Sequence, residues 1–238
     1  MKKWLQLAAL LGCWAPLASH ANDAGDLVFP TDFTDYVRWE VRYENLHRDI
    51  KVTSESPRAD DRLNADVLAL KANLGWIPNV RLDFEVGGMQ TDSGSPALLG
   101  GAGLRYLAFD HGPWRVGGFG QLQYVANLSD KQDLVGVGNV DVDYNLLGVD
   151  IGALASYRFR VADQFAVVPY AGPLLSLMRM SGDIQESARS GESYEAKESQ
   201  FFGAAVGVSL ESEGVNGIRL EMRLFDAVSI SLAAAYVF

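Results

Sequence analysis

Enzymatic chemistry would need an acid–base side chain held within hydrogen-bond reach of a nucleophile or a water molecule. His47 is the candidate for that role, and the carboxylates of Asp49, Asp60 and Asp61 stand near it in the chain. These groups occupy a polar stretch with no recognisable catalytic motif, and we interpret them as solvated loop charge. No catalytic residue is therefore predicted.

Metal and cofactor chemistry has equally little support. Asp141 and Asp143 share one face of a predicted strand, but two carboxylates without further ligands are usually just hydrated. Cys13 is the only cysteine, so a disulfide scaffold and a cysteine-rich metal site are excluded. His111 precedes Gly112-Pro113 and is interpreted as a structural turn residue. We predict neither a metal nor a cofactor.

The elements that carry these residues alternate with a period of two. Residues 36–44, 80–86 and 218–224 alternate between apolar and charged side chains, and successive strand residues point to opposite faces. No window has a sustained helical period, so the chain is predicted to be all-β. The charged faces of these three segments consist of Arg38, Glu40, Arg42, Glu44, Arg81, Asp83, Glu85, Arg219, Glu221 and Arg223.

Ten strands follow from this pattern. They are predicted at residues 36–46, 63–76, 80–89, 98–109, 114–127, 141–159, 165–180, 200–211, 217–225 and 228–238. The connections alternate between long and short down almost the whole chain. The long polar connections 47–62, 128–140 and 181–199 are expected to gather at one end and the short turns at the other.

Two architectures fit such strands. In a water-soluble β-sandwich the apolar faces form the core, whereas in a transmembrane barrel they meet lipid and the polar faces line the interior. Several strands have ten or more residues, which suits a tilted membrane span of about 9–11 residues. The alternation of long and short connections also favours the barrel, although alternation of side chains by itself fits both.

Composition and the first residues indicate an exported protein. The formal charge of −10 disfavours a nucleic-acid partner. Lys2 and Lys3, an apolar stretch and Ser19-His20-Ala21 make residues 1–21 a predicted signal peptide, followed by a short periplasmic segment, 22–35. Leu10-Leu11-Gly12-Cys13 resembles a lipoprotein box, and processing there would instead anchor the chain through a lipid on Cys13.

The last strand resembles the terminal signal of bacterial outer-membrane β-barrels. Ser231 stands at its polar position, and Tyr236 and Phe238 at its aromatic ones, while Ala233 replaces a preferred glycine. The resemblance implies an antiparallel up-and-down barrel over residues 36–238, with ten strands or, failing that, eight. It also implies insertion by the barrel-assembly machinery, contact with outer-membrane lipid and lipopolysaccharide, and location in the outer membrane of a Gram-negative-type bacterium.

In such a barrel the charged faces would meet inside. Because a buried charge is costly unless it is paired, the alternating signs predict mutual neutralisation and a largely plugged interior. We expect a monomeric integral outer-membrane protein that acts in membrane structure, surface contact or limited permeation.

Two outer-membrane enzyme families provide an alternative function. Omptin proteases use carboxylates with an Asp–His couple, and His47-Arg48-Asp49 with Asp60-Asp61 is similar in composition. Lipid A palmitoyltransferases use a loop histidine and an Asp-Ser pair, which Asp92-Ser93 resembles. A rim-active enzyme of either kind and a soluble periplasmic β-sandwich that binds a ligand remain the alternatives.

Overall fold

The computed structural model describes residues 37–52, 60–134, 138–184, 193–212, 216–224 and 228–237. The predicted signal peptide, Cys13, the segment 22–35 and Phe238 lie outside the described residues. No helix within the described ranges is long and apolar enough to cross a membrane. The strands are β1 (Val37–Val52), β2 (Asp60–Ile77), β3 (Val80–Thr91), β4 (Ala97–His111), β5 (Trp114–Leu134), β6 (Gly138–Tyr157), β7 (Phe159–Ala162), β8 (Phe165–Ile184), β9 (Ser193–Glu198), β10 (Phe202–Ser212), β11 (Asn216–Leu224) and β12 (Ser229–Val237).

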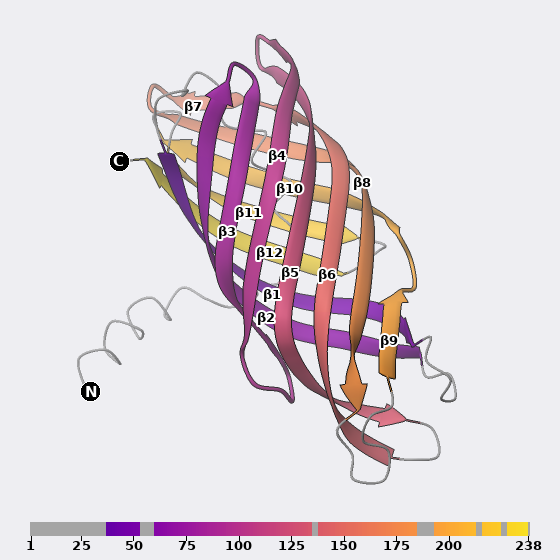
Figure 1. The fold of residues 1–238 in the computed structure, drawn as a ribbon. Coiled ribbons are helices and arrows are strands. Elements are labelled where there is room, and N and C mark those ends of the chain that lie inside the picture. Colours follow the sequence, from indigo (N-terminus) through magenta and orange to yellow (C-terminus); the bar gives the residue numbers. More distant parts are fainter. Residues whose placement is uncertain are drawn as a thin grey trace, which may run out of the picture.

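Ten of these strands form a closed antiparallel barrel (Figure 1). Each of the ten pairs with the next of the ten along the chain, so β6 pairs with β8 past the short β7, and β8 pairs with β10. The first and last strands close the circle, with Arg38 opposite Val237 and Glu44 opposite Ser231. Closure leaves no unpaired sheet edge, which hydrocarbon could not satisfy. The predicted fold class is therefore confirmed, with ten barrel strands rather than eight in the described part of the chain.

Several strands extend further than the sequence pattern predicted. Residues 181–184 of the predicted loop 181–199 belong to β8, and β9 forms within the same predicted loop. The segments 128–134 and 138–140 were expected to be loop but extend β5 and β6, and β1 and β2 likewise continue through residues 47–52 and 60–62. Backbone pairing does not require an apolar face, so the ladders continue into polar sequence beyond the point where the alternation predicted their ends.

The two ends of the barrel differ. One end, which we call the turn end, contains the tight connections after β2 and β4, where Asn79 (φ 68°) and Gly112 (φ 61°) adopt left-handed backbone conformations. The opposite end, which we call the loop end, contains β9. That short strand pairs with β8 on one side and with β1 on the other. It therefore continues the wall at the loop end, beyond the ends of the shorter strands β10, β11 and β12.

The polarity of the outer and inner faces of the barrel wall reverses between the turn end and the loop end. On β1 the outward residues change from Val41 and Tyr43 to His47 and Asp49, while the inward residues change from Arg42 to the buried Ile50. The same change occurs on β2, where Leu68 and Leu70 face outward but Asp66 and Arg62 follow them towards the loop end.

A bulge in β5 accommodates this inversion. The pairing of β5 with β6 shifts between Val125 and Leu128, and Asn127 takes a left-handed conformation (φ 55°) within the shift. One extra residue reverses the side-chain alternation. Consequently Val125 and Leu128 are both buried while Asn127 is exposed.

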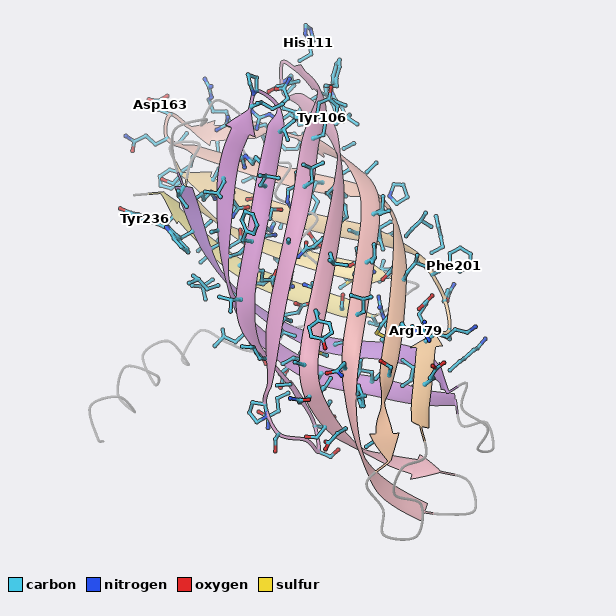
Figure 2. All side chains as sticks on the ribbon, in the orientation of Figure 1. Tyr106, His111, Asp163, Arg179, Phe201 and Tyr236 are labelled. Atoms are coloured by element: carbon cyan, nitrogen blue, oxygen red, sulfur yellow. The ribbon has the colours of Figure 1, made fainter. Side chains whose placement is uncertain are left out.

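The inversion divides the barrel into two zones. The zone towards the turn end has a belt of exposed apolar side chains, as a lipid-facing surface requires, and Tyr106 and Tyr236 project from it (Figure 2). At its boundary towards the loop end, the Tyr43 hydroxyl donates to Asp66 Oδ1 at 3.0 Å. Members of the belt include Val37, Trp39, Val41, Tyr43, Leu68, Leu70, Phe84, Val86, Leu98, Leu104, Leu122, Tyr124, Leu147, Ile151, Leu175, Leu177, Val206, Leu210, Ile218, Leu220 and Leu232.

Candidate functional site

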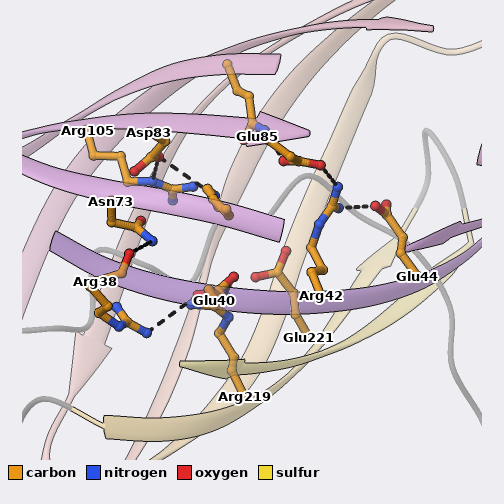
Figure 3. Close-up of polar contacts among 12 residues, drawn as sticks. Arg38, Glu40, Arg42, Glu44, Asn73, Asp83, Glu85, Arg105, Arg219 and Glu221 are labelled. Carbon is orange, nitrogen blue, oxygen red and sulfur yellow. Dashed lines mark hydrogen bonds and ion pairs between the residues drawn. The ribbon is translucent and has the colours of Figure 1, made fainter. Parts of the chain in front are cut away.

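The interior of the belt zone contains a network of buried charges (Figure 3). All ten charged residues of the predicted interior set are buried, and five more charged residues join them. Together they comprise eight basic and seven acidic side chains, so the network is nearly neutral. The five additional residues are Arg48, Lys71, Arg105, Asp150 and Glu211.

Arg42 is the centre of one part of the network. Its guanidinium forms ion pairs with Glu44 on its own strand and with Glu85 on β3. The Gln121 amide donates to the other oxygen of Glu85 at 3.1 Å. Because the Arg42 side chain is fully buried, these carboxylates replace the water that the guanidinium loses on folding.

Two further carboxylates are each shared between cations. Glu40 receives Arg219 at 2.8 Å and Arg38 at 3.5 Å. Asp83 forms an ion pair with Arg105, and the Lys71 amine lies 3.8 Å from it. Each shared carboxylate therefore links side chains of different strands: Glu40 links β1 to β11, and Asp83 links β3 to β2 and β4.

Other contacts cross between strands that are not neighbours. Arg223 on β11 donates two hydrogen bonds to Asp150 on β6, at 3.0 and 3.1 Å. Arg48 donates to the Ser176 hydroxyl at 2.8 Å. Such contacts run through the barrel interior instead of along its wall.

Gly207 allows one of these interior contacts to form. Tyr170 lies opposite Gly207, and its ring passes so close that a Cβ at this position would collide with it. The Tyr170 hydroxyl donates to Glu221 Oε2 at 2.7 Å, one strand further on. The glycine thus provides the space through which a tyrosine of β8 reaches a carboxylate of β11.

The five additional residues carry a weaker sequence signal than the predicted ones. Lys71 stands alone between Leu70 and Ala72, and Asp150 stands alone between Val149 and Ile151. A single charge inside an apolar strand indicates an inward position only when the partner strand is known. The partners of Asp150 lie in segments far away along the chain.

The interior towards the loop end is apolar, which contradicts the expectation that polar faces line the barrel throughout. There the buried side chains form what we call the outer core. The face inversion explains the correction, because beyond the belt, towards the loop end, polar side chains face outward and the apolar side chains turn inward. Its members are Ile50, Leu63, Ala65, Val67, Ala69, Met89, Ala97, Leu99, Val125, Leu128, Val142, Tyr144, Leu146, Met178, Met180 and Ala196.

A small cavity separates the outer core from the charge network. Its volume is about 60 Å³, enough for a few water molecules. Glu44, Arg48, Asp150 and Arg223 contribute its charged side, and Met89 and other apolar residues contribute the opposite side. The cavity is therefore a local gap between two packed layers.

The candidate catalytic residues lie outside this interior. The exposed His47 contacts Asn64 through Nδ1 and Oδ1 at 2.7 Å, and Asp49 pairs with Arg62 at 3.2 Å. The backbone amide of Asp92 donates to the Asn64 carbonyl at 3.3 Å, which brings the His47 and Asp92 segments together.

Several other predicted positions are less informative. Asp92 and Ser93 are exposed, as is His111 at the turn end (Figure 2). Asp143 is half-buried on the wall. The side chains of Asp60, Asp61 and Asp141 lie outside the described set. Within the part of the chain that the structure describes, no three His, Cys, Asp or Glu side chains could hold a metal ion together.

The terminal strand presents its signal residues on both faces. Ser231 is buried between Glu44 of β1 and Glu221 of β11 in the register. Tyr236 points outward with about half of its surface exposed (Figure 2). The alternation predicted for this strand is therefore present, whereas its role in assembly is a separate question.

Comparisons with known proteins agree with the barrel. No protein-family model matches the chain, and no curated protein matches it either. The solved structure of the outer membrane protease OmpT from Escherichia coli is 12% identical, covers 88% of this chain and 100% of its own, and has a TM-score of 0.51. The β domain of the Bordetella autotransporter BrkA is 14% identical, with coverages of 85% and 98% and a TM-score of 0.43.

At these identities the comparison concerns the fold alone. The OmpT structure supports it, since its TM-score exceeds 0.5 over most of both chains. The chain thus has the closed ten-strand antiparallel barrel fold that is found in bacterial outer-membrane proteins.

Proposed function

We propose that this chain is an integral outer-membrane protein of a Gram-negative-type bacterium, with a sealed interior and a water-exposed extension at its loop end. It acts in membrane structure and surface contact, and permeation through it is small. The observation that carries this proposal is the stacking of the outer core on the buried charge network. Either layer by itself would obstruct a pore, and the cavity between the described parts of the two layers has a volume of about 60 Å³.

The exposed apolar belt supports membrane insertion. A water-soluble sandwich would bury such side chains, whereas Val41, Leu98 and Ile151 each expose about half or more of their surface. Contiguous exposed apolar surface on this scale is unusual for a soluble monomer. Outer-membrane lipid and lipopolysaccharide are the proposed contacts of this belt, and the barrel-assembly machinery the proposed route of insertion for the monomer.

Cell fractionation combined with heat-modifiability tests the location. A folded barrel resists detergent, so the unheated sample should migrate differently from the boiled one and should be recovered with outer membranes. Recovery in the soluble periplasmic fraction, with no mobility difference, would contradict the proposal and favour the sandwich.

Planar-bilayer conductance tests the sealed interior. The wild-type barrel should show little or no steady current. A variant in which Leu128 and Met180 become alanine should show more frequent channel openings, because the outer core between the loop end and the charge network is then less tightly packed. A large, steady wild-type conductance would overturn the sealed interior.

The proposal also treats the barrel as non-catalytic. His47 contacts an amide and Asp49 contacts Arg62, so neither is held beside a nucleophile in the described residues. The test compares wild type with His47→Ala and Asp92→Ala for lipid A modification and for cleavage of a basic peptide. Activity in wild type that collapses in either variant would establish the rim-enzyme alternative instead.

A further inference from the structure

The buried charges are not balanced evenly along the barrel. Around the small cavity, Arg42, Arg48 and Arg223 are matched by Glu44, Glu85 and Asp150, three cations against three carboxylates. The remaining buried charges lie closer to the turn end on their strands. They comprise five cations and four carboxylates: Arg38, Lys71, Arg81, Arg105 and Arg219, with Glu40, Asp83, Glu211 and Glu221.

The rim of the turn end increases this excess. Arg115 and Arg158 are partly buried there, and Arg115 forms an ion pair with Asp110 at 3.4 Å, with 42% of the Asp110 side chain exposed. With these three residues, the described charges named here comprise seven cations and five carboxylates. Low-dielectric walls around such an excess concentrate its field and attract anions.

Glu211 is the buried carboxylate on which several of these cations act. Its side chain is fully buried, and Oε2 lies 3.0 Å from Arg158 Nη2. The charges of Arg158, Arg115 and Arg38 all act on the carboxylate. Neither carboxylate oxygen has a partner with good hydrogen-bond geometry, and the Nε of Arg158 has none either. Nε itself is buried, so a second anion would bind the exposed part of the Arg158 guanidinium beside this carboxylate.

Arg158 lies where a solute can reach it, whereas only 11% of the Arg115 side chain is exposed. The Arg158 backbone amide donates to the Pro113 carbonyl at 2.8 Å, which ties two turns together. The Arg158 side chain remains 27% exposed. The residues opposite Glu211 and its neighbours in the register are Ala166, Gly217 and Ala235, which are too short to cover the guanidinium groups.

We propose that the turn end binds a small oxyanion, a phosphate or carboxylate group, through Arg158 and Arg115. Guanidinium groups suit both because their paired N–H donors match the spacing of the oxygens. Glu211 occupies part of the same field and competes with the ligand for the arginines. This site is separate from the sealed interior and does not depend on whether the barrel conducts.

The test uses the full barrel folded in detergent, titrated with inorganic phosphate and, in a second arm, with acetate. Binding is followed by calorimetry and by the side-chain signals of ¹⁵N-labelled arginine. Arg158→Gln should weaken phosphate binding about tenfold, since a hydrogen bond to a charged group is lost. Glu211→Gln should strengthen it, because the internal competitor becomes neutral.

Arg160→Gln is the matched control, because Arg160 is an exposed arginine of the neighbouring β7 and should leave the affinity unchanged. Heat-modifiability verifies that every variant is folded, and if Arg158→Gln fails to fold, the Glu211→Gln arm decides. Binding of acetate but not phosphate would support the site and identify carboxylates as its ligands. Equal phosphate affinity in wild type and Arg158→Gln, or no saturable binding of either anion by wild type and Glu211→Gln, would overturn the proposal.

Discussion

Arg223 and Asp150 bind each other through two hydrogen bonds although 73 positions separate them in the chain. They belong to β11 and β6, which are not neighbours in the wall, so the contact spans the interior. Both side chains are almost completely buried. The pair thus links two sides of the barrel that backbone pairing connects only around the circumference.

Removing this link should be costly. Asp150→Ala takes away the carboxylate that Arg223 binds twice, and breaking a buried pair typically costs about 3–5 kcal/mol of unfolding free energy. The matched control is Asp49→Ala, whose pair with Arg62 is largely exposed, and its cost should stay below about 1 kcal/mol. Urea unfolding of barrels refolded into lipid vesicles measures both, and equal midpoints would contradict a dry interior.

Gly207 should be sensitive to a single methyl group. Gly207→Ala would displace Tyr170 from the space over the glycine and weaken its bond to Glu221. Overpacking of this kind costs about 1–3 kcal/mol. The same substitution at Gly100, where nothing lies within 4 Å of an added Cβ, should have little effect. The unfolding midpoints of the two variants provide the comparison. An unchanged midpoint for Gly207→Ala would mean that Tyr170 can move aside without cost.

The outer core should behave as a protein core and the belt as a lipid surface. Leu128 is fully buried, and Leu128→Ala should cost about 2–5 kcal/mol because it leaves a cavity. Leu122, on the same strand, has 48% of its surface exposed. In vesicles its truncation should cost less than that of Leu128. A larger loss at Leu122 would argue against the assignment of these faces.

Labelling of whole cells tests the orientation. Lys197 is exposed at the loop end, and Asp163 is exposed at the turn end (Figure 2). With the loop end outside the cell, Lys197→Cys should react with an impermeant thiol reagent and Asp163→Cys should react only after lysis. The reverse result would place the turn end outside. Ser54 and Ser190, in the predicted long loops 47–62 and 181–199, lie outside the described residues, so Lys197 is used as the labelling site for the loop end.

Assembly should depend on the chain end. Changing Tyr236 to Ala together with deletion of Phe238 should lower the amount of folded, heat-modifiable barrel and increase periplasmic degradation. Tyr106→Ala is the control, because Tyr106 is a similarly exposed tyrosine of the belt but lies on an internal strand. Equal losses in both would indicate a general need for aromatic belt residues instead of a terminal signal.

Sequence by itself determined the strand content, the antiparallel order and the inward direction of the main charges. These follow from local rules, because a period of two assigns alternate residues to opposite faces wherever a strand forms. Arg38, Glu85 and Arg219 could therefore be assigned to one face without knowing their partners. The same rules misplaced the strand ends, since pairing continues through polar residues such as Asp49 and Asp183.

Tertiary structure alone decided which charges meet and where the faces invert. Glu40 shares its carboxylate with Arg219 because β12 lies between their strands in the closed wall, a relationship 179 positions apart. Whether an apolar face meets lipid or packs inside depends on how far each strand extends beyond the belt, and the alternation is identical in both cases. Ile50 and Val41 are both apolar residues of β1, yet one is in the outer core and the other faces outward from the belt. Their odd separation of nine positions puts them on opposite faces of the strand, but only the length of β1 and the neighbours that closure brings to it decide that the inward face at Ile50 is an apolar core.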